Sequence, residues 1–157
     1  MNCKEIYLKR LVNIIDDKTM LELILRANDG TMVLGTNLVT SIERTNPNSN
    51  EQIKKTSRVL WDTLESHVGE ITSSDQSDIA LMKALFIDVL EEYANGKLAT
   101  KRLCEIVSSV NLEFDYPDWC DALYDGCDDF SRNIISDEDR TYLEVEVKNL
   151  LLEITGQ

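Results

Sequence analysis

The amino-acid sequence predicts an all-α fold, a single-domain bundle of seven or eight helices over residues 1–157. Apolar residues recur at steps of three and four along most of the chain, which is the spacing of one helix face. Residues that cap or end helices separate these stretches, and the intervening loops are only a few residues long. No segment shows the sustained alternation of apolar and polar residues that is typical of a half-buried strand.

The first third of the chain contains two predicted helices and one segment that fits two structures. Apolar residues spaced along 7–15 predict the first helix. Residues 19–22 have the pattern of a capping box and predict the start of the second helix, which Asp29-Gly30 ends. The segment 31–44 begins with apolar residues that fit an extended chain and continues with apolar residues at helical spacing. Both structures therefore stay open for this segment.

The middle third contains three predicted helices. Asn46-Pro47-Asn48 interrupts the helical pattern. Residues 49–52 form a second capping box, and the helix that begins there is predicted to end at Gly69. The next helix, 78–94, has apolar residues on more than one face, which predicts a central and largely buried helix. A third helix is predicted at 98–110.

The last two predicted helices are 117–130 and a final helix that begins after Ser136. Pro117 suits the first turn of a helix, because the N–H that proline lacks has no partner within the helix there. Acidic residues follow Ser136, where the helix dipole favours negative charge. The predicted core side of the final helix consists of Leu143, Val147, Leu150, Leu151 and Ile154.

The helix 117–130 carries four aspartates on one side, which we call the acidic face: Asp118, Asp121, Asp125 and Asp128. At about 100° per residue these four side chains lie within an arc of roughly 80°. The apolar side that anchors the helix consists of Trp119, Leu123, Cys127 and Phe130. Like charges one turn apart repel by about 0.2–0.5 kcal/mol per pair, and no Lys or Arg lies between Asp115 and Phe130. A partner of opposite charge would use this face, whereas a solvated helix surface is the simpler alternative.

Net charge and its distribution restrict the class of partner. The chain has 16 basic and 29 acidic residues, a net charge of −13, and residues 111–146 contain 12 of the acids but only two of the bases. Such a field repels nucleic acid and anionic membranes and speeds encounter with a basic protein. We therefore expect a basic protein partner, no nucleic acid and no membrane. The sequence does not indicate an oligomeric state.

Cysteine usage and the absence of targeting segments favour a cytoplasmic protein. No apolar run reaches the length of a membrane span, and the first residues do not form a secretory signal. Cys120 and Cys127 would lie two turns apart on one helix, too far to form a disulfide. We expect four reduced, mostly buried thiols, as is usual in the cytosol.

The sequence contains no motif for catalysis, metal binding or cofactor binding. His67 is the single histidine, and no family signature surrounds it or any cysteine. The cysteines and this histidine lack the short spacing of zinc ligands. A calcium loop with Gly126 at its sixth position would place Leu123 and Arg132 where oxygen ligands are required. The segment 30–35 is not followed by the lysine of a phosphate loop. We expect a protein that is not an enzyme and that has no metal or cofactor.

The second half of the chain shares a pattern of residues with a known class of proteins. The pattern comprises Gly96-Lys97-Leu98, Leu103-Cys104-Glu105-Ile106-Val107, Tyr116-Pro117-Asp118-Trp119, Leu123-Tyr124-Asp125 and Cys127-Asp128-Asp129. In this pattern residues 96–151 resemble the C-terminal half of small helical bacterial immunity proteins, which accompany polymorphic toxins, including those of contact-dependent growth inhibition systems. The resemblance implies a cytoplasmic protein that binds and neutralises a cognate toxin domain, often a nuclease.

Charge and resemblance together predict an immunity protein whose acidic face binds the cationic cleft of a basic toxin domain. A nuclease must carry basic residues to hold its substrate, and carboxylates can take the place of phosphates against them. We expect Tyr124 and Asp129 at the edge of the contact, since an aromatic residue beside charges is typical of binding hot spots. The alternative is a non-catalytic intracellular adaptor or regulator that binds a basic peptide or protein segment.

Overall fold

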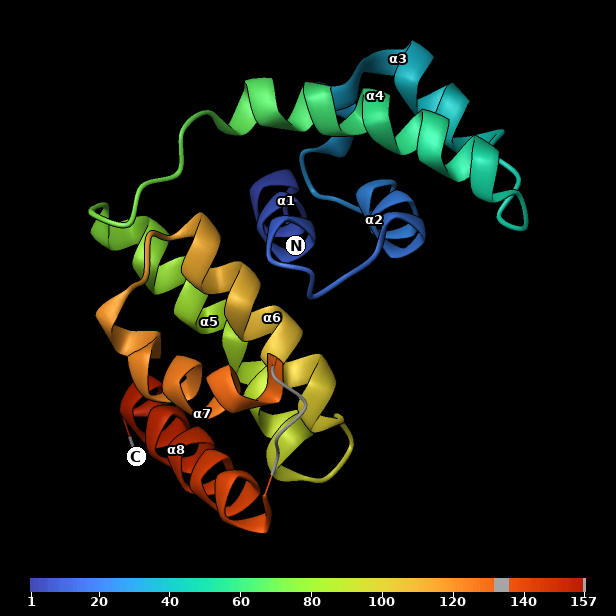
Figure 1. The fold of residues 1–157 in the computed structure, drawn as a ribbon. Coiled ribbons are helices and arrows are strands. Elements are labelled where there is room, and N and C mark those ends of the chain that lie inside the picture. The colour runs from blue at the N-terminus through green and yellow to red at the C-terminus, as the bar shows by residue number, and fades with distance from the viewer. Residues whose placement is uncertain (132–135, 157) are drawn as a thin grey trace. The chain divides into compact units, whose positions relative to one another are not determined.

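The computed structural model describes residues 1–131 and 136–156, without the side chains of residues 129–131. Within these residues the chain forms eight α-helices and one 3₁₀ helix and no strand (Figure 1), which confirms the all-α prediction. The chain divides into two compact units, Met1–Ile71 (unit 1) and Thr72–Gln157 (unit 2). Each unit buries apolar side chains of its own. That residues 1–157 form a single domain stays a prediction.

Unit 1 consists of α1 (Cys3–Leu11), α2 (Asp17–Ile24), α3 (Gly30–Glu43) and α4 (Asn50–Val68). Helix α4 packs against the other three, and α1 also packs against α2. The Trp61 ring of α4 stacks on the Tyr7 ring of α1, with ring centroids 4.5 Å apart. The buried core between these helices includes Ile6, Leu8, Met20, Ile24, Ile42, Leu60 and Leu64.

Side-chain caps decide where the first two helices begin, and they correct the predicted starts. Helix α1 begins at Cys3, before the predicted residue, because the Asn2 side chain accepts from the Glu5 N–H while the Glu5 carboxylate accepts from the Asn2 N–H. Helix α2 is capped by Asp16, whose carboxylate accepts from the Thr19 N–H at 2.8 Å. Thr19 is therefore inside the helix and does not cap it.

The segment 31–44, for which the sequence left two structures open, is helical up to residue 43. An extended structure at its start is therefore wrong. A break occurs at Gly35, whose φ of +74° suits glycine because it has no Cβ. Ser49 caps α4 as expected, but the Gln52 side chain does not complete the predicted box. Its Oε1 accepts instead from the Asn46 N–H at 2.9 Å.

Unit 2 consists of α5 (Gln76–Ala94), α6 (Thr100–Glu113), the 3₁₀ helix η1 (Asp118–Cys120), α7 (Asp121–Ser131) and α8 (Asp137–Thr155). Helix α8 packs against α5 and α7, and α6 packs against α5, η1 and α7. Ser136 caps α8 as predicted, since its hydroxyl accepts from the Asp139 N–H. The buried core of the unit includes Met82, Phe86, Leu90, Leu103, Val107, Leu123, Leu143 and Val147.

Gly126 allows α7 to lie close against α8. A Cβ at this position would lie 2.6 Å from Leu143 Cδ2 and 3.0 Å from Tyr142 Cδ1. Leu143 is completely buried, so its side chain has little room to move away. The glycine therefore sets how near the helix of the acidic face approaches α8.

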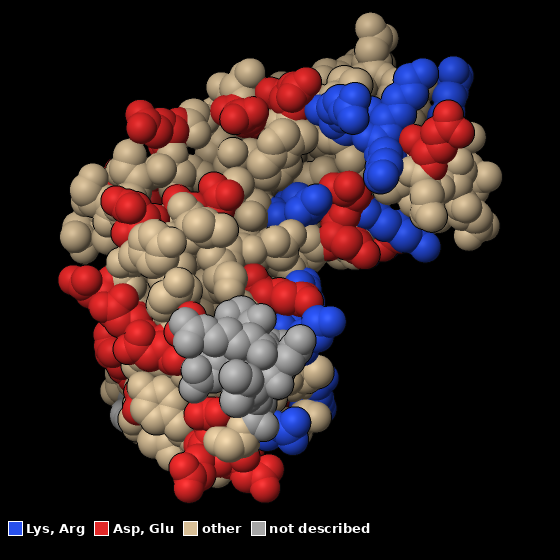
Figure 2. Space-filling model, viewed as in Figure 1, with Lys and Arg blue, Asp and Glu red and all other residues tan. Residues whose placement is uncertain are grey.

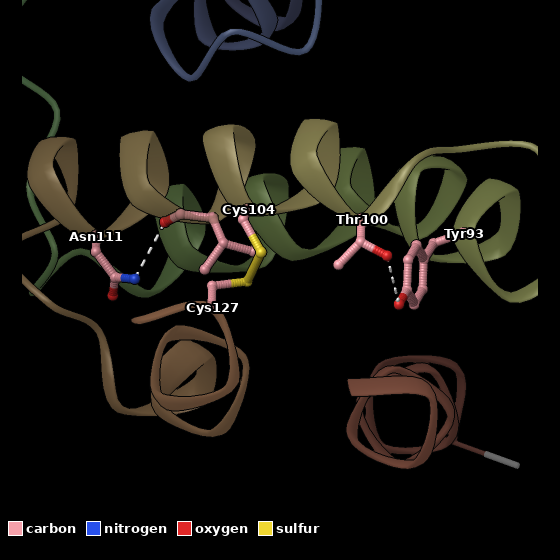
Figure 3. Close-up of a disulfide and its surroundings, with 6 residues drawn as sticks. Tyr93, Thr100, Cys104, Asn111 and Cys127 are labelled. Atoms are coloured by element: carbon pink, nitrogen blue, oxygen red, sulfur yellow. Dashed lines mark hydrogen bonds between the residues drawn. A yellow bond between two sulfur atoms is a disulfide. The ribbon is translucent and has the colours of Figure 1, made fainter. Parts of the chain in front are cut away.

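A disulfide joins Cys104 of α6 to Cys127 of α7, with Cα atoms 5.2 Å apart (Figure 3). This corrects the expectation that all four cysteines are reduced. Spacing along one helix excludes a bridge between neighbours on that helix, but it does not reveal which cysteines meet when two helices pack. Cys3 and Cys120 are buried and not disulfide-bonded. Burial is the main cause that raises the pKa of each of these thiols to about 12.

Candidate partner-binding face

The acidic face is built from two consecutive helices and not from one, as the sequence had predicted for 117–130. Pro117 has extended backbone angles, and its carbonyl accepts from the Cys120 N–H at 2.9 Å, which closes the 3₁₀ turn η1. Asp121 has helical angles and continues the chain into α7. Asp118 therefore lies on η1, whereas the other three aspartates lie on α7.

The four aspartates of the acidic face are all exposed, as the sequence predicted. Leu123 and Cys127, on the apolar side of α7, are buried. Tyr124 lies between the two sides and is half-buried. The side chains of Asp129 and Phe130 lie outside the described part of the structure. That the acidic face, Tyr124 and Asp129 bind a partner stays a prediction.

Three aspartates of this face, Asp118, Asp121 and Asp125, form no ion pair with a base in the part of the chain that the structure describes. The ion pairs of the described side chains include Arg10–Asp17, Lys83–Glu153 and Arg102–Glu105, none of which involves these three residues. The negative field extends to α8. Burial raises the pKa of Tyr142, and the carboxylates of Glu146 and Asp125 raise it further.

The two units differ greatly in charge. By sequence, unit 2 contains 19 acidic and 7 basic residues, a net charge of −12, whereas unit 1 contains 10 acidic and 9 basic residues, a net charge of −1. Figure 2 shows acidic side chains gathered on the side of unit 2 where the chain passes from η1 into α7. Most of the negative charge of the protein therefore belongs to the unit that carries the acidic face.

Trp119 anchors η1 from beneath, as the sequence predicted for this residue. Its half-buried ring meets Phe86 of α5 edge to face, with ring centroids 5.9 Å apart. The Lys83 ammonium lies 5.8 Å from the centroid of the Trp119 ring, within the range of a cation–π contact. The start of the acidic face is thereby held to the core of unit 2.

A cavity of about 220 Å³, which we call the tyrosine pocket, lies beside the acidic face. The rings of Tyr116 and Tyr124 meet there edge to face, with centroids 5.7 Å apart. Two predicted binding residues, Tyr124 and Asp128, therefore border a cavity as well as the exposed face. The pocket is lined by Ser108, Asn111, Leu112, Tyr116, Tyr124, Cys127 and Asp128.

Asn111 is a buried polar residue that lines the tyrosine pocket. Its side chain is 1% exposed, and Nδ2 donates to the Val107 carbonyl at 3.0 Å (Figure 3). Its Oδ1 is buried and has no hydrogen-bond partner within the described part of the chain. A buried acceptor without a donor costs about 1–3 kcal/mol, so this oxygen needs an explanation.

Sequence reasoning missed Asn111, Leu112 and Tyr116 because it ended the preceding helix at residue 110. Helix α6 continues to Glu113, and its capping residue Phe114 is buried. One signal was present in the sequence. Asn111 follows Cys104 by seven residues, which places a polar side chain on the inward side of the helix. Figure 3 shows both side chains on the side of α6 that faces α7.

We also searched the described residues for a metal site and for a membrane-spanning helix. Within 1–131 and 136–156, apart from the masked side chains, no group of three His, Cys, Asp or Glu residues is placed to hold a metal ion. No described helix combines the length and the apolar character that crossing a membrane requires. Comparison of the chain with protein-family models, curated proteins and solved structures gives no match.

Proposed function

We propose that this protein is a cytoplasmic immunity protein that binds and neutralises a basic toxin domain through its acidic face. The observation that carries the proposal is the exposure of all four aspartates of that face, on the unit with a net charge of −12. Asp118, Asp121 and Asp125 form no ion pair among the described residues. Their mutual repulsion is relieved when a cationic partner binds.

A nuclease domain is the kind of toxin that fits this face best. Its cleft must carry Lys and Arg side chains that hold the phosphates of its substrate. Carboxylates on a rigid helix form charge-assisted hydrogen bonds with the same side chains. The field of unit 2 also speeds encounter with such a cleft, an effect that falls as the salt concentration rises. The chain then acts by blocking the cleft, without catalysis.

One observation favours a second function, an intracellular adaptor that binds a basic peptide. The tyrosine pocket is an aromatic cavity beside negative charge, and such a cavity can hold one side chain of an extended or helical peptide. The adaptor and the immunity protein would use the same surface. They differ in whether binding protects a cell from a toxin.

Growth protection distinguishes the two functions. If the protein is an immunity protein, we expect a toxin gene directly before its own gene, and the toxin domain from that gene is expressed in a host cell with or without this protein. We expect the wild-type protein to restore growth and the Asp121→Lys/Asp125→Lys variant to fail at equal abundance and with an unchanged circular dichroism spectrum. The matched control is Asp62→Lys/Glu65→Lys, which makes the same charge change on exposed residues of α4 and should still protect.

Absence of protection by the wild-type protein would contradict the immunity function. The adaptor would then be supported if the same protein binds a lysine- and arginine-rich peptide and the acidic-face variant does not. Protection by the acidic-face variant at the wild-type level would contradict the use of this face.

A further inference from the structure

We infer that the tyrosine pocket binds one arginine side chain of the basic partner. This inference rests on the proposed function, because it names the group by which the partner is anchored beside the acidic face. Three properties of the pocket carry it. They are a buried acceptor without a donor, a pair of aromatic rings and a carboxylate at the edge.

The buried acceptor is the amide oxygen of Asn111. The Val107 carbonyl can only accept a hydrogen bond, so the amide nitrogen must face it and the oxygen must point away. That oxygen has no donor among the described residues, and the residue lines the pocket. An occupant that donates a hydrogen bond supplies what the oxygen lacks. Occupants that only accept are excluded by the same reasoning.

The rings and the edge of the pocket favour a donor that is also a planar cation. The faces of Tyr116 and Tyr124 attract a positive group, and a guanidinium can stack on them as well. Asp128, from the acidic face, also lines the pocket, and its other described lining residues include no Lys or Arg. The volume of about 220 Å³ equals about seven water molecules in the liquid, which suits a single long side chain.

Arginine fits the pocket better than lysine. A guanidinium has five donors in a plane, so it can bond Asn111 Oδ1 and a carboxylate at the same time while a ring covers its face. An ammonium group is more strongly hydrated and loses more on entering a partly apolar cavity. A neutral side chain of the same shape lacks the attraction to the carboxylate and the rings.

Access to Asn111 requires a small movement of the exposed lining. The amide is almost completely covered, whereas Leu112 is 69% and Tyr116 is 51% exposed. Tyr116 has a φ of +53°, which is uncommon for a bulky residue, and its ring lies beside that of Tyr124. Because both side chains are exposed, they can shift without disturbing the buried core.

The probe is the peptide acetyl-Gly-Arg-Gly-amide, with otherwise identical peptides that carry citrulline or lysine. Titration of the full chain is followed by ¹H–¹⁵N NMR through the side-chain amide of Asn111 and the backbone amides of Tyr116 and Tyr124. We expect saturable shifts with the arginine peptide, binding at least about tenfold weaker with citrulline, and several-fold weaker binding with lysine. Equal binding of the citrulline peptide, or no shift at Asn111, would overturn the inference.

A pocket-filling variant tests the location. Ser108 is exposed and lines the pocket, so Ser108→Phe fills it without a change in charge. The matched control is Ser66→Phe on an exposed position of α4. We expect Ser108→Phe to lose at least about tenfold in affinity for the arginine peptide and Ser66→Phe to keep wild-type affinity. Equal affinity of both variants would show that the peptide binds to surface charge outside the pocket.

Failure of this inference can be distinguished from failure of the proposed function. If Ser108→Phe binds and neutralises the toxin domain as well as wild type, the partner does not use the pocket, and the immunity function stands. If Asp121→Lys/Asp125→Lys protects cells fully, the acidic face is not the binding surface. The peptide titration then still decides whether the pocket recognises arginine.

Discussion

Cys104 of α6 is covalently joined to Cys127 of α7, the helix that carries most of the acidic face. Both residues are buried, and the same pair of helices encloses the tyrosine pocket. The disulfide therefore holds α7 against α6, with the aspartates of α7 exposed and Asn111 buried in the wall of the pocket. Disulfides are uncommon in the cytosol, so the proposed cytoplasmic location requires that this packing persists when the bond is reduced.

We predict that the disulfide stabilises the fold but is not required for it. A disulfide between residues 23 apart restricts the unfolded chain, and the entropy that this chain loses stabilises the folded state by about 3 kcal/mol. Urea denaturation of the wild-type protein should therefore shift to lower concentration in reductant. The Cys104→Ala/Cys127→Ala variant should match the reduced wild type and show no effect of reductant. Identical wild-type curves in both conditions, or four reactive thiols in the denatured protein, would show that the bond is not formed.

We predict that Gly126→Val destabilises the protein by about 2 kcal/mol. The valine Cβ would enter the space of Leu143 and Tyr142, and overpacking of a core costs about 1–3 kcal/mol. The control is Ala84→Val on an exposed position of α5, where the change costs less than about 1 kcal/mol. Chemical denaturation measures both values. Equal stability of Gly126→Val and wild type would mean that α7 and α8 do not approach this closely.

We predict that Asp16→Ala lowers the free energy of unfolding by about 1 kcal/mol at neutral pH, because it removes the cap of α2. The control Asp16→Asn keeps an acceptor for the Thr19 N–H and should lose much less. This comparison tests the cap that the sequence assigned to Thr19. Denaturation in urea measures the stability of both variants, and an equal loss in the two would contradict Asp16 as the cap of α2.

The same residue gives a pH dependence with a defined sign. The hydrogen bond from the Thr19 N–H is the main cause that lowers the pKa of Asp16 in the folded protein. A carboxyl whose pKa is lower when folded contributes stability above its unfolded pKa of about 3.9 and loses it as the pH falls through the folded pKa. The difference in stability between wild type and Asp16→Asn should therefore decrease below about pH 4. A stability difference between these two proteins that stays constant from pH 7 to pH 3 would contradict a lowered pKa of Asp16 in the folded protein.

We predict that Asn111→Leu changes stability by less than about 1 kcal/mol although the residue is buried. The substitution loses one hydrogen bond to Val107, but it also removes an acceptor that has no donor among the described residues. The lost hydrogen bond contributes about 0.5–1.5 kcal/mol and the unsatisfied acceptor costs about 1–3 kcal/mol, so the two effects largely offset each other. Denaturation checks this, and the buried Leu103→Ala, which should cost about 2–5 kcal/mol, serves as the reference.

The helices could be predicted from the sequence because their signals are local. Ser49, Gly69 and Ser136 mark helix ends through contacts with residues only a few positions away, and the structure has them at those ends. The exposure of the acidic face followed from periodicity, since Leu123 and Cys127 must be buried on the opposite side. Errors at Asp16 and at residue 110 shifted helix ends but not the order of the helices.

The tyrosine pocket and the disulfide could not be predicted because they depend on how α6 packs against α7. Cys104 and Cys127 meet only in that packing, and Asn111 becomes a buried acceptor only beneath it. The division of charge between the two units also needed the structure, because the break between Gly69 and the helix at 78–94 looks like any other connection between helices in the sequence. Tyr124 was proposed as a binding residue from its charged neighbours alone, whereas its pairing with Tyr116 comes from the fold.

The measurement that tests the acidic face most directly is the affinity of the toxin domain for three proteins, determined by titration calorimetry at low and high salt. They are the wild type, Asp121→Lys/Asp125→Lys and the control Asp62→Lys/Glu65→Lys. Like charges opposed across an interface cost several kcal/mol, so the acidic-face variant should bind at least about a hundredfold more weakly and depend less on salt. The control should stay close to wild type. An equal loss in both variants, or wild-type affinity after reversal of the acidic face, would contradict the proposed function.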